Sequence, residues 1–484
     1  MKILIRLNAQ RNPFFISVAN KFYESGHDVT IVHLLPSGLN SLRSSGLLKK
    51  GVELLDLPIL DDKVPDEEVL IEKLLEYEKK YNFTSSFILA QDRGLGRGYL
   101  FNIDRYPNRV DGWYSYETKL RKLLKKFMVI ESLIEKIQPE MILTIYTESI
   151  VTAVAKHNEI NTVQVNFSRA SVKCMFYDDS MRRNFELEKR LEYYINNIET
   201  LSDYTTEKLV RDPKATITHS KYKVSYIKAI NQIIKYTISQ LRRSIYHIRI
   251  NHKNTGYTTL AWGPSIIRQV RNYKYICKNS IRINDIKKYY KTVFFPLHLE
   301  PELALMGISP EFSNSLEAIS WISKSLPANY LLIVKEHPLS YGVRSKTYYD
   351  FLRQIPNVML SHPKIDSWDW IKKSSFVATI TGTAGFEGVY LNKPILSFGM
   401  HQVINKLPTV HYASDYKTTK MAVKKILKLP PNSPELLFSS KALSKAMDEI
   451  SFNLPGFAQS NNKSELMSES AEIFYNKIIE RYKK

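Results

Sequence analysis

Short apolar strands and amphipathic helices alternate along most of the chain, and this alternation predicts two α/β domains. The N-terminal pattern indicates a strand at 2–7, a helix at 13–25 and a strand at 28–34, which begins a βαβ unit. After residue 290 the alternation restarts and continues to the apolar strand at 394–398. Because parallel strands need crossover helices between them, we expect two doubly wound, Rossmann-like domains.

The predicted organisation has four parts. Residues 1–180 form the first Rossmann-like domain, 181–290 a basic and mainly helical insertion, 291–430 the second Rossmann-like domain, and 431–484 helices that pack back on the other domain. Two doubly wound domains in one chain suggest a ligand held in the cleft between them, at the carboxyl ends of strands.

The charge of the chain is concentrated in one segment. The 484 residues carry 69 Lys and Arg against 48 Asp and Glu, which gives a formal net charge of +21 at pH 7. Between Lys208 and Lys291 there are 19 basic residues and two acidic ones, so this stretch accounts for +17 of that charge. The remainder is close to neutral, and the charge is therefore a property of one insertion.

Part of this basic segment has the periodicity of an amphipathic helix. Isoleucine and leucine recur between residues 227 and 248 at steps of three, four and seven. A basic stripe with a spacing of seven runs along the same helix and consists of Lys228, Lys235, Arg242 and Arg249. Three interpretations are open for the stripe: a solvated face, a contact with anionic lipid headgroups, or a nucleic-acid footprint.

Cysteine usage and hydropathy exclude several protein classes. Cys174 and Cys277 are far apart, and neither has a second thiol or a histidine at metal-ligand spacing, which excludes a disulfide scaffold and a zinc ribbon. This usage fits a reducing cytosol. No secretory signal is expected, because Arg6 and Asn8 interrupt the first apolar run. No run of about 18 apolar residues is present to cross a bilayer, so any membrane contact would be peripheral.

The most specific chemical signals lie in the second domain. The segment YLLIVKEHP places Lys335, Glu336, His337 and Pro338 where a buried strand ends, and open α/β sheets bind ligands at that edge. A histidine there is able to donate a hydrogen bond to a phosphate oxygen, and the proline ends the strand. Taken alone, the motif fits equally a histidine that caps local carbonyl groups.

A turn rich in glycine and threonine follows two strands later. It leads from a strand into a helix and consists of Thr381, Gly382, Thr383, Ala384 and Gly385. Free backbone N–H groups at such a helix start suit a phosphate. Glu387, expected in the first turn of the helix, is placed to accept from both ribose hydroxyls. A tight β–α turn with an acid favourable to the helix dipole is the alternative; the pairing with the His-Pro motif favours a nucleotide.

Further candidates are spread over both domains. His298, Glu300 and Glu302 open the second domain, and each is suited to act as an acid, a base or a substrate ligand, with a plain surface loop as the alternative. In the first domain Glu148 and Arg169 follow apolar strands. An arginine in such a place suits a carboxylate or a phosphate.

One glycine-rich run does not match a nucleotide motif. QDRGLGRGYL places Arg93 beside three glycines, but its spacing and context do not fit a dinucleotide fingerprint. We interpret it as a flexible, basic loop on the acceptor side. No Asp-x-Asp pair occurs in the chain, which argues against a metal held beside a diphosphate. We therefore expect metal-independent chemistry and no cofactor.

Together these motifs resemble the capsule polysaccharide biosynthesis family, which is related to bacterial β-Kdo glycosyltransferases, where Kdo is 3-deoxy-D-manno-octulosonic acid. The motifs that carry the resemblance are FFPLHLEPE, VKEHP, TGTAGFEG with KPILSFG after it, the pair Asp92-Arg93, the strand-end Glu148, and NFSRAS followed by FYDD. The resemblance covers residues 85–180 and 290–402 and leaves out the basic insertion and the C-terminal helices.

The resemblance implies the GT-B architecture, in which two Rossmann-like domains bind the acceptor and the donor nucleotide respectively. It implies that His337 and Pro338 contact the donor phosphate. The remaining donor site would consist of Lys335, Glu336, the turn Thr381–Gly385 and Glu387. Residues expected to bind substrate are Arg93, Arg169 and His298. The candidates for catalysis are Glu148, His337 and Glu302.

The activity that the resemblance implies is transfer of a sugar from a nucleotide donor, such as CMP-Kdo or a related CMP-sugar, to a capsular or other surface polysaccharide. A lipid-linked acceptor favours the lipid interpretation of the basic stripe, with a cytoplasmic protein peripheral on the inner membrane, and disfavours nucleic acid. Two alternatives stay open. One is a CDP-glycerol-type glycerophosphotransferase, although those enzymes usually have Asp-Tyr-Ser-Ser where this chain has Gly-Thr-Ala-Gly-Phe-Glu. The other is a non-catalytic component of polysaccharide assembly or export.

Overall fold

The structure is a computed structural model that describes residues 1–7, 12–34, 36–57, 67–92, 115–146, 148–169, 173–205, 224–249, 262–299, 303–312, 314–457 and 464–482. The chain forms two compact units. The first consists of Met1–Ile88, Tyr116–Lys189 and Met447–Lys484, and the second of Leu89–Ser115 and Arg190–Ala446. The segment 181–290, expected as a separate insertion, is therefore divided between the two units at Arg190.

The first unit is built on a six-stranded sheet with the order β3-β2-β1-β4-β5-β6. Its strands are β1 (Lys2–Leu7), β2 (Asp28–His33), β3 (Glu53–Leu55), β4 (Met141–Thr144), β5 (Asn161–Phe167) and β6 (Cys174–Tyr177). All neighbouring pairs are parallel except β5 and β6, which are antiparallel. Strand order reverses between β1 and β4, because β1 pairs with β2 on one side and with β4 on the other.

The second unit repeats this topology in the order β12-β11-β10-β7-β8-β9, with every pair parallel. Its strands are β7 (Lys291–Pro296), β8 (Tyr330–Lys335), β9 (Val358–Leu360), β10 (Phe376–Thr379), β11 (Ile395–Ser397) and β12 (Val410–Tyr412). Both sheets thus have the Rossmann strand order. The prediction of two Rossmann-like, doubly wound domains is confirmed, and two such units in one chain are the components of the predicted GT-B architecture.

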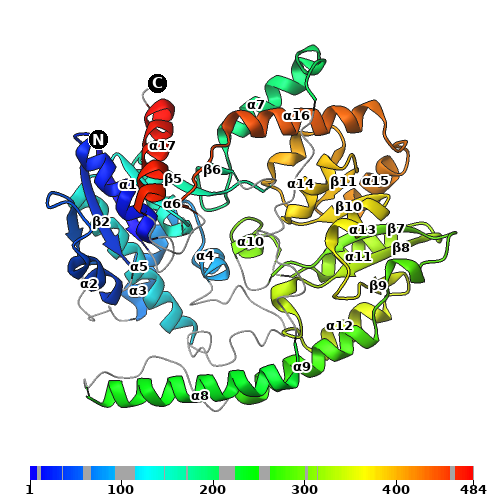
Figure 1. Ribbon diagram of the computed structural model, residues 1–484, viewed down its shortest axis with the longest axis horizontal. Helices are drawn as coiled ribbons and strands as arrows, with labels where there is room; N and C mark the ends of the chain where they lie inside the picture. The colour runs from blue at the N-terminus through cyan, green and yellow to red at the C-terminus, as the bar shows by residue number, and fades with distance from the viewer. Residues whose placement is uncertain are drawn as a thin grey trace. The chain divides into compact units, whose positions relative to one another are not determined.

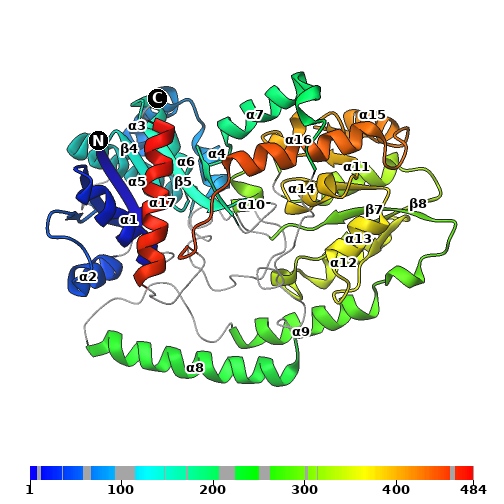
Figure 2. The same cartoon turned by 45° about the horizontal axis from the view of Figure 1, so that its top comes forward.

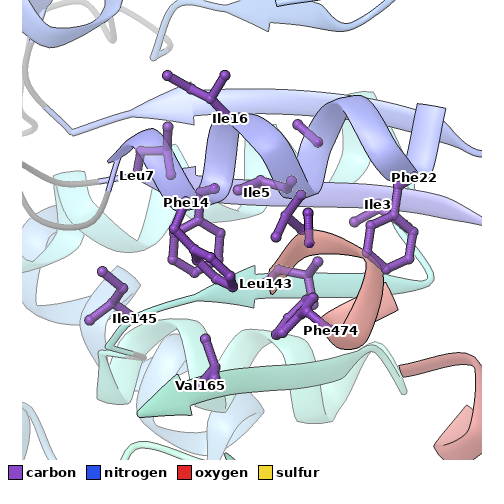
Figure 3. Packing of buried hydrophobic residues seen from close by; sticks show 14 of the residues in the cluster. Ile3, Ile5, Leu7, Phe14, Ile16, Phe22, Leu143, Ile145, Val165 and Phe474 are labelled. Carbon is purple, nitrogen blue, oxygen red and sulfur yellow. The ribbon is translucent and has the colours of Figure 1, made fainter. Parts of the chain in front are cut away.

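One face of the first sheet carries a large apolar core. Alternate residues of β1 point to the same face, and Ile3, Ile5 and Leu7 pack there with Leu143 and Phe474 (Figure 3). The helices of this unit are α1 (Asn12–Glu24), α2 (Pro36–Ser45), α3 (Glu67–Tyr81), α5 (Tyr116–Ile137), α6 (Ser149–His157), α7 (Phe185–Asn196) and α17 (Ser464–Tyr482), with α4 (Ser85–Gln91) at its boundary. Helix α7 begins in this unit and continues into the second.

The C-terminal helix α17 belongs to the first unit. It lies beside α1, from the opposite end of the chain (Figure 1). The rings of Phe14 and Phe474 meet edge to face, with centroids 5.6 Å apart, and Lys21 of α1 forms an ion pair with Glu472 of α17. The last residues therefore complete the core that the first residues begin.

The helices of the second unit surround its sheet and include the basic segment. They are α9 (Trp262–Lys278), α10 (Leu303–Met306), α11 (Leu316–Ser325), α12 (Lys346–Gln354), α13 (Ser367–Lys373), α14 (Thr383–Tyr390), α15 (Tyr416–Ile426) and most of α16 (Pro434–Ile450), together with α8 (Tyr226–Arg249). The predicted amphipathic helix corresponds to α8.

The N-terminal part of α8 packs on α9 (Figure 2). In this contact Ala229 and Ile233 of α8 lie against Ile266 and Val270 of α9. The exposed residues Ile227, Ile230, Ile234 and Ile238 of α8 are not part of this contact. Among the described residues, no helix is both long and apolar enough to span a membrane.

We predict that Phe474→Ala destabilises the protein by about 3–5 kcal/mol, because it opens a cavity at the contact between α17 and α1. Urea unfolding measures the change. Leu75→Ala, at an exposed position of α3, is the control and is expected to change stability by no more than about 0.5 kcal/mol. Equal effects of the two substitutions would show that α17 is not part of the folding unit.

Candidate functional site

The loops after β7, β8, β10 and β11 meet at the carboxyl edge of the second sheet. Strands β7 and β10 are neighbours, yet β8 and β11, which follow them in the chain, lie on opposite sides of this pair. Open α/β sheets bind ligands at such a switch point, because the crossover connections leave it in opposite directions. His298 follows β7, and the Thr381–Gly385 turn follows β10. Two of the sequence-predicted segments therefore flank the switch point.

His298 links the two sides of the switch point. Its ring is buried, and Nε2 accepts a hydrogen bond from the backbone N–H of Thr381 at 3.0 Å. Because Nε2 must supply a lone pair for this bond, the neutral ring carries its proton on Nδ1. The carbonyl oxygen of His298 accepts from Nη2 of Arg344 at 2.6 Å. The histidine thus holds the turn after β10 in register with the end of β7.

A buried ion pair fixes the segment after β8. Glu336 and Arg344 form a salt bridge with side-chain exposures of 2% and 1%. The second carboxylate oxygen of Glu336 accepts from the Tyr349 hydroxyl at 2.7 Å, and burial, followed by the Glu336 charge, raises the pKa of Tyr349 well above its usual value. The first oxygen also accepts from the His337 backbone N–H at 2.7 Å. These contacts favour a positioning role for Glu336, which the sequence placed among the nucleotide ligands.

Lys335 and His337 occupy different environments. Lys335 is buried, and its Nζ donates to the Tyr341 hydroxyl at 3.0 Å, which in turn donates to the carbonyl oxygen of Pro363 at 2.8 Å. His337 is partly exposed and stands just before the 3₁₀ helix Pro338–Ser340. Of the two side chains, His337 is therefore the more accessible to a ligand at this edge.

The turn after β10 brings backbone N–H groups to the edge of the sheet. Gly382 is the N-cap of α14 and has no side chain with which to cap the helix. A Cβ at Gly382 would lie 2.7 Å from Oγ1 of Thr379 and 3.6 Å from Nε2 of His298. Only glycine therefore allows the backbone to pass this close to Thr379. Thr383, the first helical residue, is exposed. An uncapped helix start of this kind is suited to an anion, which would accept from its free N–H groups.

Gly385 has a different role from the one expected, and Glu387 a different place. At Gly385 a Cβ would lie 2.9 Å from Cδ1 of Ile404 and 3.0 Å from Cγ2 of Thr379. This glycine therefore serves the close packing of α14 on the sheet. Glu387 is the fifth residue of α14 and lies in its second turn, not in the first. Its predicted contact with a ribose stays a prediction.

In the first unit Glu148 and Arg169 lie at the carboxyl edge of the sheet. Glu148 is the N-cap of α6, makes no side-chain capping bond and is 46% exposed. Its Oε2 is 3.7 Å from Nη2 of Arg6, a buried residue near the end of β1. Sequence reasoning missed Arg6 as a site residue; the available signal was a lone arginine inside an apolar strand.

Several predicted residues lie outside the described residues. These are Arg93, Glu300 and Glu302. Arg242 and Arg249 lie in α8, but the structure does not describe their side chains. Within the described ranges no group of three or more His, Cys, Asp and Glu side chains is placed to hold a metal ion.

Residues 167–402 match the family model described as capsule polysaccharide biosynthesis protein. This match confirms the resemblance to the family but not its predicted bounds, because it includes the basic segment 181–290 and does not include residues 85–166. The matched range contains His298, His337 and the Thr381–Gly385 turn, and it begins after Glu148. No curated protein matches the chain.

Solved structures similar to this chain share little sequence with it. S. aureus MnaA with UDP is 12% identical, with 99% of this chain and 97% of that chain covered and a TM-score of 0.28. UDP-GlcNAc 2-epimerase from Neisseria meningitidis, bound to UDP-GlcNAc, is 12% identical over 99% and 100%, with a TM-score of 0.27. The β-Kdo 2,7-transferase of Thermosulfurimonas dismutans is 12% identical over 65% and 80%, with a TM-score of 0.31. At such TM-scores these similarities carry no conclusion about activity.

We expect Arg344→Met to destabilise the protein by about 3–5 kcal/mol, because it leaves the Glu336 carboxylate buried without its cation. The double variant Arg344→Met with Glu336→Gln should recover part of the loss, since it removes the uncompensated charge. Chemical denaturation measures both. Arg353→Met, at an exposed arginine of α12, is the control. A loss at Arg344 no larger than at Arg353 would contradict a structural role for the ion pair.

Proposed function

We propose that this chain is a glycosyltransferase that moves a sugar from a nucleotide donor onto a capsular or other surface polysaccharide. The observation that carries the proposal is the switch point of the second unit, where the uncapped start of α14 lies beside His298. The family match supports the proposal, because residues 167–402 include this whole edge and the family is one of capsule polysaccharide biosynthesis.

In the proposed site the donor phosphate binds at the start of α14. Backbone N–H groups and the positive end of the helix dipole stabilise negative charge there. His337 donates a hydrogen bond to the same phosphate from the loop after β8. Stabilising the charge that develops on the departing nucleotide is the main requirement of the reaction. These groups supply that stabilisation without a metal, in keeping with the absence of an Asp-x-Asp pair from the sequence.

The proposed donor is a CMP-sugar, with CMP-Kdo as the first candidate. The assignment rests on the resemblance of the His337-Pro338 pair to the phosphate-contacting pair of CMP-sugar enzymes. Glu148 is the proposed acid, base or nucleophile, because its half-exposed carboxylate is not used to cap α6. Arg6 lies 3.7 Å from this carboxylate and forms an ion pair with it.

For the donor site we predict that CMP and CMP-Kdo raise the melting temperature, and that His337→Ala weakens their binding by about 1.5–3 kcal/mol through the lost phosphate hydrogen bond. Calorimetric titration in the presence of EDTA measures the affinity and tests metal independence. His411→Ala, on the edge strand β12, is the matched control and should bind as the unaltered protein does.

The outcomes of this titration separate the parts of the proposal. Protection by UDP- or GDP-sugars and not by CMP nucleotides would overturn the donor assignment alone. Absence of binding by every nucleotide sugar would overturn the transferase proposal. Product formation is followed by mass spectrometry with a panel of nucleotide sugars.

We also propose that α8 docks on an anionic membrane surface, where a lipid-linked acceptor is found. Its exposed row consists of Ile227, Ile230, Ile234 and Ile238, with exposures of 75%, 53%, 51% and 47%. Residues three and four apart share one face of a helix. Lys228 and Lys235 are exposed beside this row, so apolar and basic side chains face solvent together, as in helices that lie in a membrane interface.

We predict that Lys228→Glu with Lys235→Glu reduces binding to vesicles that contain anionic lipid, because each lysine contributes about 1 kcal/mol near such a surface. Ile230→Asn with Ile234→Asn should reduce binding as well, since it removes the apolar contact. Co-sedimentation with vesicles measures both effects. Lys417→Glu, at an exposed site on α15, is the control. Unchanged sedimentation of both α8 variants would make the basic stripe a solvated face.

A further inference from the structure

Helix α9 has an exposed basic side that the proposed donor site does not use. Arg271, Lys274 and Lys278 are exposed, and they follow one another at steps of three and four residues, so they share one side of the helix. Ile267, four residues before Arg271, is 36% exposed on the same side. These four residues are the α9 basic face. Neither α8 nor α9 contains an Asp or a Glu that would neutralise it.

The α9 basic face stands beside the exposed isoleucine row of α8. Nζ of Lys274 lies 4.3 Å from the centre of the Tyr226 ring, at the start of α8. Ala229, later in α8, lies in one apolar cluster with Val270, earlier in α9, so the two helices run antiparallel. Tyr226 and Ile230 are four residues apart and share a side of α8. Lys274 therefore lies on the side of the helix pair to which the isoleucine row points.

The isoleucine row is thus bounded by cations on both sides. Lys228 and Lys235 each follow an isoleucine of the row, which places them one step of about 100° further round α8. Tyr226 and Lys274 lie on the opposite flank, toward α9. An apolar strip between two lines of exposed cations suits a membrane interface, because the strip enters the boundary of the acyl chains while the cations meet the headgroups.

A different side of α9 fixes it to the body of the second unit. The Asn272 side chain donates to the carbonyl oxygen of Gly342 at 3.1 Å and to that of Arg344 at 2.7 Å. A Cβ at Gly342 would lie 2.0 Å from the carbonyl oxygen of Gln269, so the segment after β8 passes close against α9. The α9 basic face therefore keeps one orientation on the unit, and α9 is joined to the segment that carries His337.

The combination of cations and exposed isoleucines favours a lipid surface over other partners. A second copy of this chain that presented the same face would repel it, because both faces are positive. A nucleic acid would attract the cations through its phosphates but would leave the isoleucines in water. An anionic bilayer satisfies both, since its headgroups attract the cations and its acyl region takes up the apolar side chains.

We propose that the α9 basic face and the isoleucine row of α8 form one docking surface for an anionic bilayer, in which α9 supplies the second line of cations. The inference rests on the proposed docking of α8 and deepens it, and it does not depend on the transferase activity. Because α9 is held on the segment after β8, docking also gives the donor-site edge of the second unit a fixed position relative to the bilayer.

The first test is co-sedimentation of the full chain with vesicles of phosphatidylglycerol mixed with phosphatidylcholine. Arg271→Gln with Lys278→Gln should weaken binding roughly 25-fold, about fivefold for each charge lost near the surface. Both side chains are exposed, so the variant is expected to fold. The matched control is Lys417→Gln with Lys420→Gln, at two exposed lysines of α15. This helix packs on β11 and β12, at the other edge of the sheet from β9, and its variant should bind as the unaltered protein does.

The second test needs no variant. Lysines of the unaltered protein are acetylated at low conversion with a water-soluble succinimidyl ester, with and without vesicles, and the products are measured by mass spectrometry. Lys274 and Lys278 should react several-fold more slowly when anionic vesicles are present and at an unchanged rate with vesicles of phosphatidylcholine alone. Lys417 and Lys420 should react at the same rate in every case. Equal protection by both kinds of vesicle would overturn the role of the cations.

Failure of this inference differs from failure of the proposals on which it builds. If Lys228→Glu with Lys235→Glu loses binding while the α9 variant does not, and Lys274 and Lys278 stay unprotected, the α9 basic face is overturned and the docking of α8 stands. Absence of sedimentation with anionic vesicles would overturn both. Protection by a duplex oligonucleotide and not by vesicles would assign the α9 basic face to nucleic acid and overturn the proposal. Calorimetric titration with CMP uses no vesicles, so its outcome concerns the transferase alone.

Discussion

The reversal of strand order at the centre of each sheet determines where this molecule is able to bind ligands. In the second unit β7 and β10 lie side by side, but the chain leaves them toward opposite edges. The connections from β7 and β10 therefore leave in opposite directions, and the loops after these two strands face each other. His298 and the turn after β10 are anchored to each other at this point. The first unit repeats the arrangement between β1 and β4.

The two switch points have the same topology and different electrostatics. In the second unit the edge offers backbone N–H groups and a histidine held as a hydrogen-bond acceptor, while the strongest charges, Glu336 and Arg344, neutralise each other inside the unit. In the first unit the buried Arg6 forms an ion pair with the half-exposed Glu148 at the carboxyl edge of the sheet. Fixed dipoles suit a diphosphate or monophosphate that changes its charge during a reaction, because they need no rearrangement. Fixed full charges suit a group that stays ionised throughout.

Periodicity and strand-end chemistry were sufficient to predict most of the fold. The strand at 2–7 has the predicted bounds, because a short, mostly apolar run followed by a polar segment has few other structures open to it. The features that could not be predicted depend on contacts between residues that are distant in the chain. From the sequence, Arg6 was an interruption of an apolar run, and only its register with β4 places it beside the end of that strand. Gly385 resembled part of a phosphate turn, whereas contacts with Ile404 show a packing role. The isoleucine pattern of α8 predicted a helix but not which face it buries.

The position of α17 against α1 has a consequence for biosynthesis. Phe14 and Phe474, in contact in the folded protein, leave the ribosome 460 residues apart. At about 5–20 residues per second this interval is roughly 20 to 90 s. During that time the apolar face of the first sheet is covered by α1 but lacks α17, while the second unit, whose strands lie between Lys291 and Tyr412, is free to fold. The first unit is thus the last to be completed, and its nascent form exposes the apolar side chains that later contact α17.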